Sequence, residues 1–181
     1  MINALNFCKE LKNKGYLVSV QPVSITTYSD RDWLDLIDLV NELKPFAMSL
    51  VDTYGLLHKD RLFKYFNLLD NNLNKDIEIG YHAHNNFQLA YSNTIELLNI
   101  NTKRNIIIDS SLYGMGKSAG NLNTELIAEY LNKIYDKDYD IFEIINTIDL
   151  EILNLTSKYN WGYQLEFYLS AINECHPTYV K

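Results

Sequence analysis

The 181-residue sequence predicts an α/β domain built around a parallel sheet. Short apolar runs rich in β-branched residues alternate with longer segments whose apolar residues recur at helical spacing. This alternation is typical of βαβ crossovers, which join parallel strands that are buried on both faces. A polar cluster follows each apolar run, and in such folds the ligand site lies at the carboxyl ends of the strands. The sequence therefore predicts the fold class and the end of the sheet where a site would lie.

Four strand-then-helix units are expected after one unpaired helix, which covers residues 5–13 and ends at Gly15. The expected strands cover residues 16–20, 46–51, 77–81 and 105–108. The helices that follow them are expected over residues 29–43, 59–69, 89–98 and 124–133. Ser29 with Asp32 three residues later is a capping-box signal for the first of these helices. From Asp140 onward two more helices are expected, with a break at residues 160–162.

Composition restricts the classes of partner. The formal net charge of −7 argues against nucleic acid and anionic membranes, because both require clustered Lys and Arg. Cys8 and Cys175 are the only cysteines and lie near opposite ends, which favours a reducing compartment over a disulfide framework. No apolar run approaches the roughly 20 residues that span a bilayer. We expect a cytoplasmic protein that acts on a small molecule.

The stretch GYHAHNNF, residues 80–87, places two of the four histidines at the end of an expected strand. Residues i and i+2 of a strand point to the same face, so His82 and His84 can present both imidazoles to one point. This arrangement suits a metal ion, since histidine is the commonest metal ligand. The alternative is that two polar rings line a wet strand end and have no further role. The polar clusters at the neighbouring strand ends favour the metal interpretation.

The stretch DSSLYGMGKSAGN, residues 109–121, follows an expected strand and contains Gly-Lys-Ser. A phosphate-binding P-loop would need a glycine at position 111, which is Ser111, so nucleotide hydrolysis is disfavoured. Phosphate binding through Lys117 remains a third hypothesis. Glycines in this loop free its backbone to approach a ligand, and the helix that follows could favour an anion such as a carboxylate.

These two stretches, in this order and spacing, resemble the C-terminal half of the DRE-TIM metallolyases. That family includes hydroxymethylglutaryl-CoA lyase, isopropylmalate synthase and 4-hydroxy-2-oxovalerate aldolase. The VDTYG stretch, residues 51–55, is similar to a family motif at the end of the sixth strand, and residues 161–180 look like the tail of bacterial aldolase-domain proteins. The resemblance implies a partial (β/α)8 barrel of about four C-terminal βα units over residues 1–135. A helical C-terminal extension would then cover residues 136–181.

The resemblance also implies a site. His82, His84 and Asn121 would be metal ligands, and the metal would be Mn²⁺ or Mg²⁺, with Zn²⁺ and Co²⁺ as alternatives. Residues beside the metal or the substrate would be Asp52, Asn86, Asp109, Gly114, Gly116 and Gly120. The two aspartates could orient the histidines, or could simply cap loops. The expected chemistry is a carbon–carbon lyase or aldolase reaction of a 2-oxo acid, through a metal-stabilised enolate.

Two departures from the family pattern matter. The glycine loop lacks the catalytic cysteine of hydroxymethylglutaryl-CoA lyases, which disfavours that activity. The family's first-strand aspartate ligand and arginine have no counterpart here, so the general base is unknown and the chain is expected to be a fragment of the full enzyme. The competing hypothesis is a catalytically inactive half-barrel that acts as an assembly module. The open sheet edges of a half-barrel predict a homo-oligomer, or pairing with a missing half-barrel.

Overall fold

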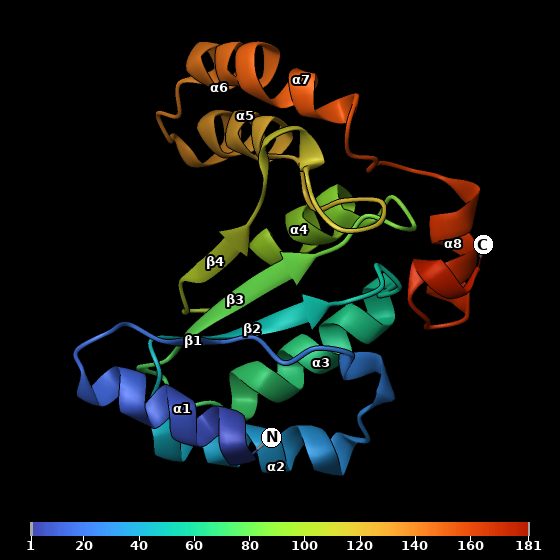
Figure 1. Ribbon diagram of the computed structural model, residues 1–181. Coiled ribbons are helices and arrows are strands. Elements are labelled where there is room, and N and C mark those ends of the chain that lie inside the picture. The colour runs from blue at the N-terminus through green and yellow to red at the C-terminus, as the bar shows by residue number, and fades with distance from the viewer. Residues whose placement is uncertain (1, 181) are drawn as a thin grey trace.

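The computed structural model describes residues 2–180 and contains a four-stranded parallel sheet in the order β1-β2-β3-β4 (Figure 1). Its strands are β1 (Ser19–Val20), β2 (Ala47–Asp52), β3 (Glu78–Ala83) and β4 (Ile106–Asp109). Each pair is parallel, with Val51 opposite His82 and His82 opposite Asp109. Because strand order follows chain order, each helix crosses back to start the next strand, as in one side of a (β/α)8 barrel. The predicted partial-barrel fold is confirmed.

The helices follow the predicted order. They are α1 (Ile2–Asn13), α2 (Asp30–Leu43), α3 (Lys59–Asn72), α4 (Ala90–Leu98) and α5 (Thr124–Tyr135). Ser29 caps α2 with both hydrogen bonds of the capping box, because its side chain accepts from the Asp32 amide and its own amide donates to the Asp32 carboxylate. Gly15, with φ of +88°, supplies the left-handed residue that ends the first helical segment.

The C-terminal part adds α6 (Ile141–Thr147), a π-helical turn (Ile148–Ile152), α7 (Leu153–Thr156) and α8 (Leu165–Ile172). In Figure 1, α6 and α7 stack over α5, and α8 lies beyond the carboxyl ends of the strands. Between α7 and α8 the chain has no helix at residues 160–162, where a break is predicted. His176 caps a short 3-10 turn at Pro177–Tyr179.

The hydrophobic core lies between the outer face of the sheet and helices α2, α3 and α4. Alternate strand residues, such as Met48, Leu50, Ile79 and Tyr81, point to this face and are fully buried. Trp33 of α2 is also fully buried and packs edge-on against Tyr28 and Tyr65. Burial of this face holds the strands in the register that aligns their carboxyl ends.

Strand β1 is shorter than predicted. The sequence favours a strand over residues 16–20, but only Ser19–Val20 form one. Tyr16 and Leu17 remain exposed, since β1 is an edge strand with β2 as its single neighbour in the sheet. Propensity alone does not make a strand where the partner backbone is absent. The short edge leaves the face beside β1 open.

The opposite, inner face of the sheet carries small and polar residues. By register, Ser49 of β2 lies opposite Gly80 of β3, and a β-carbon on Gly80 would lie 2.2 Å from Ser49 Oγ. His82 of β3 lies on the same face two residues after Gly80, opposite Asp109 of β4 and closer to the carboxyl ends of the strands. The close approach of β2 and β3 at Gly80 therefore lies directly beneath the two histidines.

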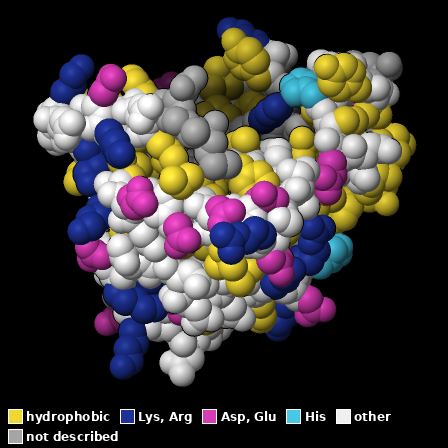
Figure 2. All heavy atoms as spheres, turned by 90° about the horizontal axis from the view of Figure 1, so that it is seen from below, with side chains coloured by type: hydrophobic (Ala, Val, Ile, Leu, Met, Phe, Trp, Pro, Cys, Tyr) yellow, Lys and Arg dark blue, Asp and Glu magenta, His cyan; other side chains and the backbone are white. Residues whose placement is uncertain are grey.

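Acidic and basic side chains are interspersed on the face shown in Figure 2. This mixed surface agrees with the net charge of −7 and with the expectation of a small-molecule partner. Within residues 2–180, no helix is both long and apolar enough to cross a membrane.

Candidate metal centre

His82 lies in the last part of β3, and its orientation is fixed by Asp109 at the end of β4. The His82 Nδ1 atom lies 2.9 Å from Asp109 Oδ2. A carboxylate oxygen can only accept, so this contact places the proton on Nδ1 and leaves the Nε2 lone pair for another partner. Carboxylates commonly hold metal-binding histidines in this way.

His84 lies just beyond β3, and a backbone carbonyl fixes its orientation. The His84 Nδ1 atom lies 3.1 Å from the carbonyl oxygen of Asp52. The carbonyl also accepts only, so His84 too is held with its Nε2 lone pair available. The two imidazoles thus have the same tautomer, through two different acceptors on neighbouring strands.

The two rings lie together. Their centroids are 5.2 Å apart, with an interplanar angle of 63°. Burial lowers the pKa of His84, and the nearby charges of His82 and Lys117 act in the same direction, while the hydrogen bond to Asp52 opposes them. A lowered pKa favours the neutral imidazole, which is the form that binds metal.

Asn121 reaches the same place from the glycine loop. It forms an isolated antiparallel bridge with His84, so the two residues lie directly opposite each other. Its Nδ2 donates to the Met115 carbonyl at 3.3 Å, while its Oδ1 is buried and has no hydrogen-bond partner among residues 2–180. A buried carbonyl oxygen without a donor is costly unless something else satisfies it. A cation beside the imidazoles would do so.

Glycines allow the loop to fold tightly against Asn121. A β-carbon on Gly116 would lie 2.5 Å from Asn121 Nδ2, and one on Gly120 would lie 2.0 Å from the Gly114 carbonyl oxygen. Gly114 and Gly120 also have positive φ angles of +62° and +82°. These three glycines shape the loop that carries the amide.

The Asp52 side chain has a structural role here. Its carboxylate accepts hydrogen bonds from the Leu56 and Leu57 amides at 2.9 and 3.0 Å, so it caps the loop after β2. Burial raises the pKa of Asp52 to about 6, despite the amides of Leu57, Leu56 and Gly55 and the charge of Arg61. Asp52 orients His84 only through its backbone carbonyl.

Asn86 turns its amide toward the C-terminal helix α8. It is buried, and its Nδ2 donates to the Phe167 carbonyl of α8 at 3.0 Å. The side chain therefore joins the loop after β3 to the C-terminal helix. An aromatic contact between Phe87 and Tyr168, whose ring centroids lie 5.4 Å apart, strengthens the same junction.

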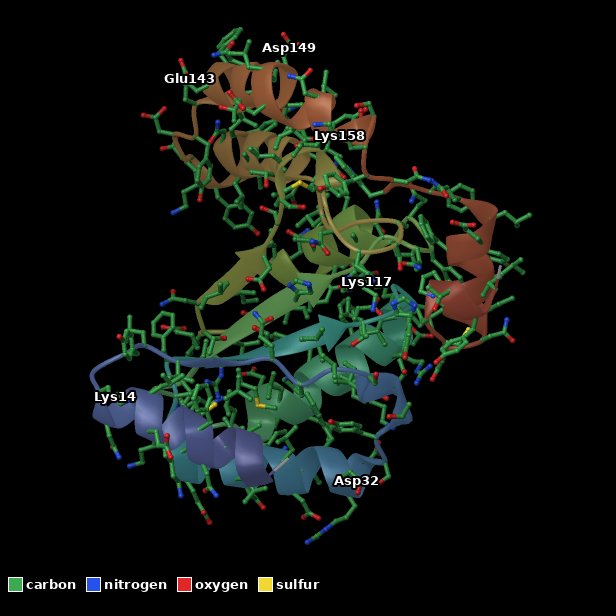
Figure 3. The ribbon with its side chains drawn as sticks, in the orientation of Figure 1. Lys14, Asp32, Lys117, Glu143, Asp149 and Lys158 are labelled. Atoms are coloured by element: carbon green, nitrogen blue, oxygen red, sulfur yellow. The ribbon has the colours of Figure 1, made fainter. Side chains whose placement is uncertain are left out.

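The Gly-Lys-Ser sequence does not open a helix. Helix α5 begins at Thr124 with Asn123 as its N-cap, seven residues after Lys117. A P-loop requires its Lys and Ser at the helix start, so the phosphate-binding hypothesis loses its structural basis. Lys117 is exposed, and Figure 3 places it at the carboxyl end of the sheet, near the glycine loop.

The residues that are present fit a divalent cation. His82 and His84 offer two imidazole nitrogens at the end of β3, and Asn121 lies opposite His84 with an amide oxygen that no described residue satisfies. Among residues 2–180, no group of three or more His, Cys, Asp or Glu side chains forms a complete site. Mixed nitrogen and oxygen donors suit Mn²⁺, Mg²⁺, Zn²⁺ or Co²⁺, with further ligands from water, substrate or protein.

Two residues that touch the site or its loop are not among the candidates that the sequence predicts. The Gln21 side chain donates to Asp109 Oδ2 at 2.9 Å, from the other edge of the sheet. Trp161 Nε1 donates to the Tyr113 carbonyl at 3.0 Å, so the segment before α8 holds the glycine loop. The position of Gln21 directly after an expected strand is the sequence signal for its contact with Asp109. Nothing in the sequence indicates the contact of Trp161 with Tyr113.

Comparisons with known proteins agree on the family. The sequence model of the HMGL-like family matches residues 2–150. A 4-hydroxy-2-oxovalerate aldolase of Bacillus thuringiensis (strain Al Hakam) is 32% identical over 148 residues, covering 80% of this chain and 40% of the relative. One from Thermomicrobium roseum is 33% identical over 101 residues, covering 55% of this chain and 27% of the relative. The chain thus spans less than half the length of these curated relatives.

Solved structures show the same fold. The N-terminal domain of a Bacteroides vulgatus protein superposes with a TM-score of 0.81 at 26% identity, covering 98% of this chain and 57% of that one. Hydroxymethylglutaryl-CoA lyase of Pseudomonas aeruginosa gives a TM-score of 0.69 at 14% identity, covering 94% and 59%. The lyase likeness concerns the fold alone. Because the family match extends over residues 2–150 of the 181, this chain belongs to the HMGL-like family.

Proposed function

We propose that this chain carries the metal-binding part of a carbon–carbon lyase or aldolase site that acts on a 2-oxo acid. The observation that carries the proposal is the pairing of His82 and His84, whose ring centroids lie 5.2 Å apart, with Asn121 directly opposite His84. Each imidazole is held through Nδ1, and the amide oxygen between the glycine loop and β3 lacks a partner. Family membership and the aldolase relatives support the reaction class.

The bound ion would be held by His82 Nε2, His84 Nε2 and Asn121 Oδ1. A divalent ion polarises a carbonyl and stabilises the negative charge that develops when a bond beside it breaks. Asp109 and the Asp52 carbonyl would hold both imidazoles in one tautomer, and Lys117 lies near the same end of the sheet. Mn²⁺ and Mg²⁺ are our first choices, because oxygen ligands from a 2-oxo acid favour them.

Metal binding is tested by titrating Mn²⁺ into the 181-residue chain and following free Mn²⁺ by electron paramagnetic resonance. We expect one site per chain, lost in His82→Ala and in His84→Ala. His176→Ala is the matched control, since His176 is exposed and caps a distant turn, and it should bind as the unaltered chain does. Equal binding by His82→Ala, or no binding by the unaltered chain, would remove the proposal.

The substrate class is tested separately with oxalate, a planar mimic of the pyruvate enolate. We expect oxalate to tighten Mn²⁺ binding and to change the Mn²⁺ spectrum, because it can complete the coordination shell with two oxygens. Succinate, which has the same charge but cannot form the same five-membered chelate, is the control. If oxalate does not change Mn²⁺ binding, the metal site remains supported, but the proposal of a 2-oxo acid substrate is overturned.

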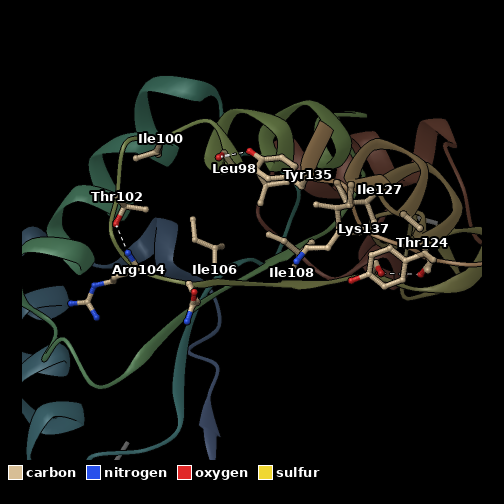
Figure 4. A pocket seen from close by; sticks show the side chains of 15 residues that line it. Leu98, Ile100, Thr102, Arg104, Ile106, Ile108, Thr124, Ile127, Tyr135 and Lys137 are labelled. Atoms are coloured by element: carbon tan, nitrogen blue, oxygen red, sulfur yellow. Dashed lines mark hydrogen bonds between the residues drawn. The ribbon is translucent and has the colours of Figure 1, made fainter. Parts of the chain in front are cut away.

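The two sheet edges support a further proposal about assembly. A cavity of about 520 Å³ borders β4 between α4 and α5, and its mixed lining includes the apolar Ile106, Ile108 and Ile127 (Figure 4). The Tyr135 hydroxyl closes part of it by donating to the Leu98 carbonyl at 2.7 Å. Thus one edge strand runs beside a partly apolar hollow.

The other edge has a matching groove. A groove of about 350 Å³ lies along β1 and is lined by Leu5, Val20 and Tyr28 among others. Just before β1, Leu17 is 81% exposed. Open edges and exposed apolar residues favour association. In the isolated chain the occupant would be a second copy, because two four-stranded sheets related by a two-fold axis make the eight parallel strands of a closed barrel.

Light scattering at micromolar concentration tests the assembly. We expect about twice the 21.1 kDa of one chain. Leu17→Asp should give a monomer that remains folded, since the side chain is exposed within one chain. Leu150→Asp, at an exposed site on the π-helical turn, is the control. A monodisperse monomer of the unaltered chain would contradict the assembly, and aldol cleavage by this chain alone would eliminate a purely structural role.

A further inference from the structure

Gln21 connects the two edges of the sheet. It directly follows β1, the first strand of the order β1-β2-β3-β4, yet its Nε2 donates to Asp109 Oδ2 at the end of β4 at 2.9 Å. Two strands lie between these residues, at about 4.8 Å per strand. Side chains of this length meet across that distance only because the sheet curls and both point toward its inner face.

The oxygen that Gln21 contacts is the one that holds His82. Asp109 Oδ2 lies 2.9 Å from Gln21 Nε2 and 2.9 Å from His82 Nδ1. A carboxylate oxygen has room for two donors, and two donors on one oxygen restrict rotation of the carboxylate. We infer that Gln21 is a positioning residue for the metal ligand His82, acting through Asp109. This inference rests on the proposed metal site.

The partial exposure of His82 and Asp109 explains why the hydrogen bond from Gln21 matters. The side chains of His82 and Asp109 are 26% and 30% exposed, so water can compete for the carboxylate. Without Gln21, Asp109 can rotate and accept from water, and His82 then loses part of its preference for the Nδ1-protonated tautomer. Gln21 itself is exposed and contributes little burial, so its loss should leave the fold intact.

The charge of the donor matters as well. A glutamate at position 21 would keep the length of the side chain but bring a second carboxylate against Asp109, where like charges repel. A leucine would keep the approximate volume and donate nothing. Ser19 is a matched control, because it lies in β1 two residues before Gln21, and residues two apart in an extended chain point to the same face.

The test combines Mn²⁺ affinity with a readout from the metal-free chain. Partners that orient a metal ligand typically change metal affinity about 10- to 100-fold, and Gln21 acts one bond further away, so Gln21→Leu should weaken binding about 3- to 10-fold. Gln21→Glu should weaken it more, and Ser19→Ala should not change it. In the Asp109→Ala background, Gln21→Leu should have no further effect, because its route to His82 is gone.

Imidazole nitrogen NMR of the metal-free chain at pH 8 reads the His82 tautomer directly. We expect the Nδ1-protonated form to dominate in the unaltered chain and to decrease in Gln21→Leu, with an unchanged urea midpoint. If Gln21→Leu changes neither the His82 tautomer nor the Mn²⁺ affinity, the inference is overturned and the metal site is not affected. The same holds if Gln21→Leu lowers Mn²⁺ affinity equally in the unaltered chain and in the Asp109→Ala background. A tautomer change in a chain that binds no Mn²⁺ would instead uphold the positioning role and overturn the proposed function.

Discussion

The Arg104 guanidinium donates to Asp70 from Nε to Oδ1 at 2.6 Å, and so joins the segment before β4 to α3. Arg104 also donates to the backbone carbonyls of Leu73, Asn74 and Ile77. Its side chain is only 4% exposed. These contacts satisfy carbonyls at the end of α3 and before β3, which water would otherwise have to reach.

Replacing Arg104 should therefore destabilise the whole domain. Arg104→Met keeps the apolar stem but removes the buried hydrogen bonds to Asp70 and to the carbonyls of Leu73, Asn74 and Ile77, which should lower the free energy of unfolding by roughly 2 to 4 kcal/mol. Lys75→Met is the control, since Lys75 also contacts Asp70 but is 70% exposed, and it should cost less than about 1 kcal/mol. Urea unfolding measures both, and equal effects would refute the assigned role of Arg104.

Gly80 should tolerate no side chain while Ser49 is present. A β-carbon there would lie 2.2 Å from Ser49 Oγ and 3.0 Å from Ser49 Cβ. Gly80→Ala should cost roughly 1 to 3 kcal/mol, as overpacking usually does. Adding Ser49→Gly removes both contacts, so the double variant should be more stable than the sum of the single changes predicts. Additive urea midpoints would show that another contact excludes the side chain.

The buried carboxyl of Asp52 should make stability fall as pH rises. Its pKa is raised from 3.8 to about 6 by burial, so the folded state binds the proton more tightly than the unfolded state. The associated stability is present below pH 3.8 and is lost as the pH rises through about 6. The loss approaches roughly 3 kcal/mol, at 1.36 kcal/mol per unit of pKa.

Asp52→Asn tests this pH dependence, because the amide does not titrate. The free energy of unfolding of Asp52→Asn minus that of the unaltered chain should increase by up to about 3 kcal/mol between pH 4 and pH 7. The amide also loses one of the two loop contacts to Leu56 and Leu57, which lowers stability equally at every pH. A difference that stays constant with pH would contradict the raised pKa.

Gly116 should control metal affinity through Asn121. A β-carbon at Gly116 would lie 2.5 Å from Asn121 Nδ2, so Gly116→Ala must displace the amide. We expect Mn²⁺ affinity to fall about tenfold, as for other losses of ligand orientation, with little change in the urea midpoint. Met115→Leu is the control, since its side chain is partly exposed and its carbonyl still accepts from Asn121. Unchanged affinity in Gly116→Ala would argue against Asn121 as a ligand.

The sequence by itself determined the order of elements and the end of the sheet where polar residues gather. Periodicity specifies which residues are buried, and the period of two places His82 and His84 on one side of the chain. The Ser29 capping box is visible in the sequence for the same reason, since it depends on contacts between residues three apart. These features are local, and local geometry is nearly independent of the rest of the fold.

Tertiary structure decided which partner each side chain finds. The contact between Gln21 and Asp109 joins residues 88 positions apart, and it depends on the curl of the sheet. Asp52 turns its carboxylate to the loop after β2 and only its carbonyl to His84, and Asn86 turns to α8. An aspartate or asparagine at a strand end can serve a loop, a helix or a site equally well, because its short side chain takes the nearest donor or acceptor. Packing of the strands and the C-terminal helix makes that choice.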